Sequence, residues 1–111
     1  MTGNEKIAAV KALVENDAKA TDALVMVYLS QAQSDIMLEL YRAYGSVPEG
    51  AMMPEMYDNL QCDLAARKFL RRGAQAESAH NENGVNRTYA STDDAELLKK
   101  VMPYAKVVGT T

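Results

Sequence analysis

Cysteine and histidine are nearly absent from this sequence of 111 residues, which contains one of each. A single cysteine excludes an internal disulfide and a cysteine-based zinc cluster, and it fits a reducing cytosol. Cys62 and His80 stand eighteen positions apart, without the further ligands that a zinc site requires. We therefore expect no metal site, with Cys62 as a small core residue and His80 as an exposed loop residue.

Long apolar runs and a large excess of charge are also missing. No apolar run approaches the roughly 18 residues of a membrane span, and the N-terminus lacks the basic and then apolar layout of a signal peptide. The formal net charge is -3 and the pI is about 5.1, unlike a basic protein that binds DNA phosphates tightly. We expect a soluble chain that is not secreted and has no membrane partner.

Sequence motifs for nucleotide binding and catalysis are absent too. Neither a G-x-x-x-x-G-K nor a G-x-G-x-x-G run occurs, and no motif supports a Ser or Cys nucleophile. Asp93, Asp94 and Glu96 form an acidic cluster, but the central glycine of a calcium loop is missing, so we interpret them as charges at a helix N-terminus. We expect no enzymatic activity and no cofactor.

Helix-forming residues dominate what is present, with seventeen alanines against eleven valines and isoleucines. Thr2 and Glu5 have capping-box spacing and predict a short first helix up to Asn16. Thr21 or Asp22 predicts the start of a second helix.

The second helix is predicted to run from Asp22 to Tyr44, to end at Gly45 and to be the longest element. Its predicted core stripe is Val25, Leu29, Ala32, Ile36 and Leu40, widened by Met26, Tyr28 and Met37.

A third, central helix is predicted to begin at Pro54 or Glu55 and to be capped by Gly73. Its apolar residues surround much of its circumference and comprise Met56, Tyr57, Leu60, Leu64, Ala65, Ala66, Phe69 and Leu70. Residues 46–66 carry four acids and no base, whereas residues 67–72 carry four bases and no acid. The bases are Arg67, Lys68, Arg71 and Arg72, which form either a contact surface for phosphates or carboxylates, or a solvated helix end.

The remaining chain is predicted to be a polar loop or loose hairpin over residues 74–91, with a turn at Asn83 and Gly84, followed by a last helix. That helix is capped by Asp93 with Glu96 and is ended by Pro103, and residues 105–111 are a flexible tail. The fold class is therefore all-α, one domain over residues 1–111 with about four helices and a long polar loop. Most methionines and tyrosines are expected in the core.

The stretch RRGAQAESAHNENGVNRTYAS, residues 71–91, resembles the head-tail connector family of tailed phages, whose members are also called adaptor, head-completion or DNA-packaging proteins. The matching residues are Arg72, Gly73, Ala74, Ser78, Glu82, Asn83, Gly84, Arg87, Thr88 and Tyr89. Gln75 and Ala76 replace the usual Glu and Gly. The resemblance extends over roughly residues 20–109.

This resemblance implies a non-catalytic protomer of the virion, assembled in the host cytoplasm. It implies a ring of copies under the portal that extends the DNA channel and offers a platform to the next connector, stopper or tail protein. Double-stranded DNA would pass through without specific binding. The resemblance also implies intersubunit contacts or loop geometry for Arg71, Arg72, Gly73, Glu82, Asn83, Gly84, Arg87 and Tyr89.

One alternative function stays open at this point. The basic face from Arg67 to Arg72 is also compatible with a small helical regulator that binds nucleic acid. Such a regulator would bind DNA with a salt-sensitive affinity, which a connector has no need of.

Overall fold

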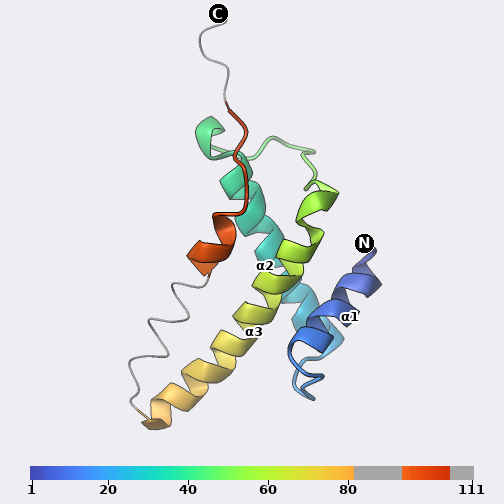
Figure 1. Cartoon of the computed structure of the whole chain (residues 1–111), viewed down its shortest axis with the longest axis vertical. Coiled ribbons are helices and arrows are strands. Elements are labelled where there is room, and N and C mark those ends of the chain that lie inside the picture. The colour runs from blue at the N-terminus through green and yellow to red at the C-terminus, as the bar shows by residue number, and fades with distance from the viewer. Residues whose placement is uncertain (82–93, 106–111) are drawn as a thin grey trace, which may run out of the picture.

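The structure is a computed structural model that describes residues 1–81 and 94–105, without the side chains of residues 73–81. Its elements are α1 (Gly3–Leu13), α2 (Asp22–Leu40), α3 (Asp58–Asn81) and two 3-10 turns, η1 (Arg42–Tyr44) and η2 (Glu55–Tyr57). Residues 94–98 form a further short helix, and the described ranges contain no strand. The predicted all-α bundle is confirmed (Figure 1). Most of the predicted polar loop, residues 82–91, lies outside the described residues.

The predicted starts of the first two helices are confirmed by side-chain caps, whereas the third predicted helix opens as the 3-10 turn η2 at Glu55 and becomes α-helical at Asp58. The Thr2 hydroxyl accepts a hydrogen bond from the Glu5 N–H at 3.1 Å, and the Glu5 carboxylate accepts one from the Thr2 N–H at 2.7 Å. The Thr21 hydroxyl accepts a hydrogen bond from the Leu24 N–H at 3.2 Å, so Thr21 caps α2. Each cap satisfies a backbone donor that the first helical turn leaves without an intrahelical partner.

The predicted helix ends are less accurate. α2 stops at Leu40, and the chain tightens into η1 before Gly45, whose φ of 81° suits a residue without Cβ. The predicted end at Gly73 is wrong, because α3 continues through it to Asn81, which makes α3 and not α2 the longest element and places His80 in a helix. An interior glycine costs about 1 kcal/mol relative to alanine, but the helix formers at residues 74–77 favour continuation.

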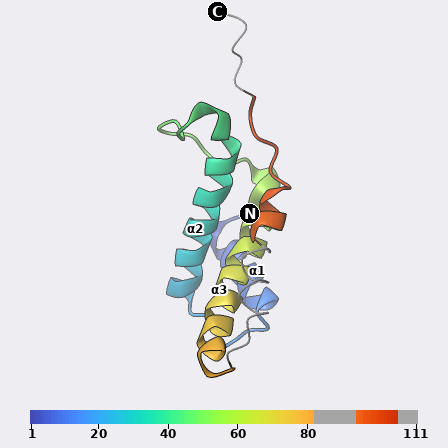
Figure 2. The same ribbon diagram turned by 90° about the vertical axis from the view of Figure 1, so that its left-hand side faces the viewer.

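α3 is central, as predicted, and packs against both α1 and α2 (Figures 1 and 2). All five residues of the predicted α2 stripe are buried, together with Met37. The core of the described residues is Val10, Val14, Ala20, Val25, Leu29, Ala32, Ile36, Met37, Leu40, Tyr57, Leu60, Cys62, Leu64, Ala65, Ala66, Phe69, Leu97 and Val101. Cys62 is therefore the core residue that the sequence predicts.

Several apolar residues assigned to the core are instead exposed. The exposed fractions are 56% for Met26, 75% for Met56 and 53% for Leu70. Only Met37 of the seven methionines is buried, and Met52 and Met102 expose 83% and 74%. The methionine prediction is therefore wrong. Exposed methionines are common at protein-binding surfaces, where their flexible side chains adapt to a partner.

Candidate assembly surfaces

The basic end of α3 forms ion pairs within the chain. The Lys68 ammonium lies 2.8 Å from an Asp35 carboxylate oxygen and 3.6 Å from one of Asp94. The Arg71 guanidinium donates to the same Asp94 oxygen at 2.7 Å. These contacts join α2, α3 and the short helix at residues 94–98.

This pairing decides between the two interpretations of the basic face for two of its residues. The Lys68 side chain exposes only 11% of its surface, and Lys68 and Arg71 balance carboxylates of their own chain. Lys68 and Arg71 are therefore not part of a solvated helix end. A phosphate that bound to either residue would have to compete with these carboxylates. Arg72 is exposed and remains available for an outside contact.

The acidic cluster contributes to the same arrangement. Asp94 is the shared partner of Lys68 and Arg71, and Glu96 pairs with Lys99 at 3.0 Å. Among the described residues no group of three or more His, Cys, Asp or Glu side chains could hold a metal ion. Asp93 lies outside the described residues.

The structure describes part of the predicted assembly set. Arg71 and Arg72 lie on α3, and Gly73 lies inside that helix instead of ending it. The other members lie outside the described residues and comprise Glu82, Asn83, Gly84, Arg87 and Tyr89.

Residues 94–105 form a strap that closes the bundle beside α2 and α3. Leu97 and Val101 are buried, and the Met102 N–H donates to the Tyr57 hydroxyl at 3.0 Å. The Tyr104 N–H donates to the Leu40 carbonyl at 2.8 Å. The strap is therefore held by apolar packing at its start and by backbone hydrogen bonds at its end. Sequence reasoning missed these anchors, and the last helix ends at residue 98 and not at Pro103, where the sequence predicted its end.

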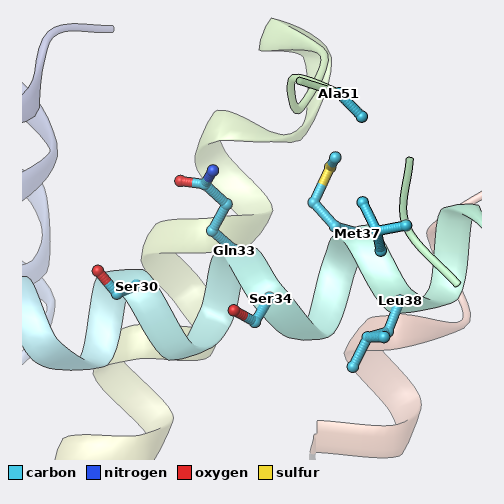
Figure 3. Close-up of a pocket in the computed structure, with 7 residues that line it drawn as sticks. Ser30, Gln33, Ser34, Met37, Leu38 and Ala51 are labelled. Carbon is cyan, nitrogen blue, oxygen red and sulfur yellow. The ribbon is translucent and has the colours of Figure 1, made fainter. Parts of the chain in front are cut away.

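An open groove lies between α2 and the loop over residues 45–51 (Figure 3). Its volume is about 480 Å³, and its lining residues are Ser30, Gln33, Ser34, Met37, Leu38, Val47 and Ala51. None of the seven carries a charge. Sequence reasoning missed the groove, and the signal that could have indicated it is the uncharged run over residues 23–34.

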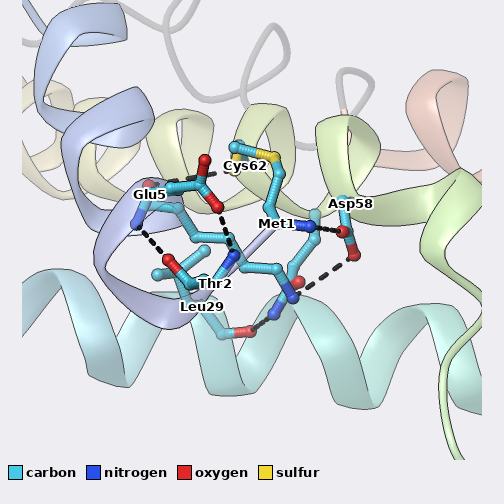
Figure 4. A network of polar contacts seen from close by, with 8 residues as sticks. Met1, Thr2, Glu5, Leu29, Asp58 and Cys62 are labelled. Carbon is cyan, nitrogen blue, oxygen red and sulfur yellow. Dashed lines mark hydrogen bonds and ion pairs between the residues drawn. The ribbon is translucent and has the colours of Figure 1, made fainter.

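A polar network joins the start of the chain to the start of α3 (Figure 4). The Met1 ammonium lies 2.8 Å from the Asp58 carboxylate, and the Lys6 ammonium lies 3.3 Å from it. Burial by itself would raise the pKa of Asp58, but the hydrogen bonds from Met1 and Lys6 together outweigh burial, so this pKa lies below its ordinary value. The ionised carboxylate therefore stabilises the fold.

Asp58→Asn should lower the melting temperature at pH 7 by about 5 to 10 °C, because it removes charge-assisted hydrogen bonds at a buried position. The pKa of Asp58 is lower in the folded chain than its unfolded value of about 3.9, so its contribution is present above about pH 4 and is lost as the pH falls below that. Thermal melts followed by circular dichroism across this range should show the difference between variant and parent shrinking. Asp63→Asn on the same helix controls for net charge, and a pH-independent difference would contradict the role of the Asp58 charge.

No helix of the described residues is both long and apolar enough to cross a membrane. The polar groups that the structure does bring together are salt bridges and caps, which hold elements in place. The exposed features among the described residues include an uncharged groove, single apolar side chains and Arg72. These are features suited to contacts with other proteins.

Comparison with known proteins gives one family. The family model described as phage gp6-like head-tail connector protein matches residues 4–104. No curated protein and no solved structure matches the chain. The matched range includes α1, which the resemblance over residues 20–109 did not reach, and it ends inside the strap. The description of the family names the junction between the head and the tail of the virion, and it names no catalytic reaction. The chain belongs to the family of phage gp6-like head-tail connector proteins.

Proposed function

We propose that this protein is an adaptor protomer that assembles as a ring of copies under the portal of a DNA-filled head. The ring extends the DNA channel and gives the next connector, stopper or tail protein a surface to bind. Assembly takes place in the host cytoplasm. The observation that carries this proposal is the family match over residues 4–104, which covers all of the described helices except the first residue of α1.

The charge distribution supports a channel through which DNA passes without tight binding. Each phosphate that a protein neutralises adds affinity through counterion release. The net charge of -3 and the internal pairing of Lys68 and Arg71 keep this contribution to DNA affinity small. The same observations weigh against the nucleic-acid-binding regulator.

A closed ring requires two different surfaces on each protomer, because each copy contacts its two neighbours in a head-to-tail manner. The basic end of α3 and the polar segment after it are one such surface in our proposal, opposed by acidic residues of a neighbour. Its contact residues are Arg71, Arg72, Gly73, Glu82, Asn83, Gly84, Arg87 and Tyr89.

Arg72→Glu should weaken assembly on the portal about tenfold, because it places like charges in the proposed contact. Arg72 is the informative position, since reversing Arg71 would also repel Asp94 inside the chain. Mass measurement of the purified protein with and without portal, by sedimentation, reads the result. The exposed Lys19 in the turn before α2 provides the matched control Lys19→Glu, which should assemble normally.

Two outcomes would oppose the proposal. Unchanged assembly of Arg72→Glu would remove the basic end of α3 from the contact. Failure of the parent protein to bind portal, together with sequence-specific DNA binding in a mobility-shift titration at moderate salt, would favour the regulator instead.

A further inference from the structure

The groove on α2 offers apolar and hydrogen-bonding side chains but no charged side chain. Met37 reaches toward Ala51 at one end, while Ser30, Gln33 and Ser34 follow one another along the helix (Figure 3). Apolar side chains thus lie beside three side chains that can donate and accept hydrogen bonds. An extended peptide requires both kinds of contact, because its backbone N–H and C=O groups have no internal partners.

The face of α2 that continues the groove is also uncharged. Residues 23–34 contain no Asp, Glu, Lys or Arg, although the helix has a side that faces solvent. The exposed fractions on that side are 50% for Val27 and 60% for Leu38. A solvent-facing helix surface normally carries charges, so this face suits coverage by protein.

Residues 106–111, with the sequence KVVGTT, have the matching chemistry. Five of the six side chains are uncharged, so their burial in an uncharged groove buries no charged side chain. Val107 and Val108 supply apolar side chains that can pack against the apolar lining residues Met37, Leu38 and Val47 of the groove.

The place where this segment begins favours the groove of a second copy over that of the same chain. Ala105 lies beside Tyr44, because the Tyr44 hydroxyl donates a hydrogen bond to the Ala105 carbonyl at 3.4 Å. The strap passes the end of α2 on one side, and the loop over residues 45–51 lies on the other side (Figure 2). Six extended residues span about 20 Å, most of which would be used in passing around a helix about 10 to 12 Å wide.

We propose that the α2 groove of each protomer binds residues 106–111 of a second copy. This inference rests on the proposed ring, in which one flank of a protomer meets the opposite flank of the next. The strap and the groove then supply the two unlike surfaces of one continuous contact. The groove and the basic end of α3 are separate parts of the protomer, so each can be tested alone.

Disulfide trapping tests the proposal, because Cys62 is buried and burial raises the pKa of its thiol, which leaves little competing reaction. A synthetic peptide of residues 106–111 carrying V108C is oxidised with full-length chain carrying Ser34→Cys. Ala12→Cys, exposed on α1 and outside both the groove and the uncharged face of α2, is the matched control. We expect the peptide to react at least tenfold faster with the Ser34 variant. Chains carrying only Ser34→Cys, mixed with chains carrying only Val108→Cys, should form covalent dimers.

Equal rates at both positions would overturn the groove as a binding site. This peptide assay needs no ring, so it can fail while portal binding and assembly proceed normally. Equally, the peptide can bind the groove of a chain that does not assemble on the portal. An internal disulfide in the chain carrying both Ser34→Cys and Val108→Cys, with no covalent dimer from the mixed single variants, would show that the segment covers its own groove. That outcome would overturn the assignment to a second copy.

Discussion

Replacing Leu64 by alanine should lower the free energy of unfolding by about 2 to 5 kcal/mol. Leu64 is fully buried, with an exposed fraction of 0%, and lies on α3, the helix that packs against both α1 and α2. The truncation therefore removes apolar contacts and leaves a cavity that three packed helices cannot easily fill. A domain of this size is stable by only about 5 to 15 kcal/mol, so the loss is a large fraction of the total.

Leu70→Ala on the same helix is the matched control for this prediction. Leu70 exposes 53% of its surface, so the same truncation should cost less than about 1 kcal/mol. Urea unfolding of both variants, followed by circular dichroism, gives the two free energies. Equal losses would contradict the packing of α3 described here.

The sequence predicts α2 better than α3 because the two helices differ in how their apolar residues are distributed. The α2 stripe from Val25 to Leu40 repeats with helical period, and all of it is buried. On α3 the apolar residues surround the helix, so periodicity alone cannot separate Leu64 from Leu70. Only the positions of α1, α2 and the strap decide which side of α3 is covered.

The candidate surfaces were less predictable than the helices. Asp35, Lys68 and Asp94 are far apart in the sequence, and sequence spacing relates charges only within one helix, at three or four positions. The groove likewise requires Val47 and Ala51 to fold back on α2. In both cases the sequence supplies residues of the right type, and tertiary structure brings them together.

Lys68→Met should lower the free energy of unfolding by about 2 kcal/mol and loosen the strap. Lys68 is the shared cation of Asp35 and Asp94, and its removal leaves Asp35 without this partner. The Asp94 carboxylate also has one buried oxygen without a hydrogen-bond partner, so any weakening of its remaining contacts is costly. Amide hydrogen exchange at residues 97–104 should rise more than exchange in α1, because the ion pairs hold the first turn of the strap against α3.

A double-mutant cycle separates the charge effect from the loss of the Lys68 side chain. If the pairing with Asp94 carries the effect, the cost of Lys68→Met should shrink in an Asp94→Asn background, which has no carboxylate charge at that position. Lys100→Met, at an exposed position near the end of the short helix, should change stability by less than about 0.5 kcal/mol. Equal costs in both backgrounds would indicate that Lys68 stabilises the fold through its contact with Asp35 and its aliphatic chain, and not through the strap.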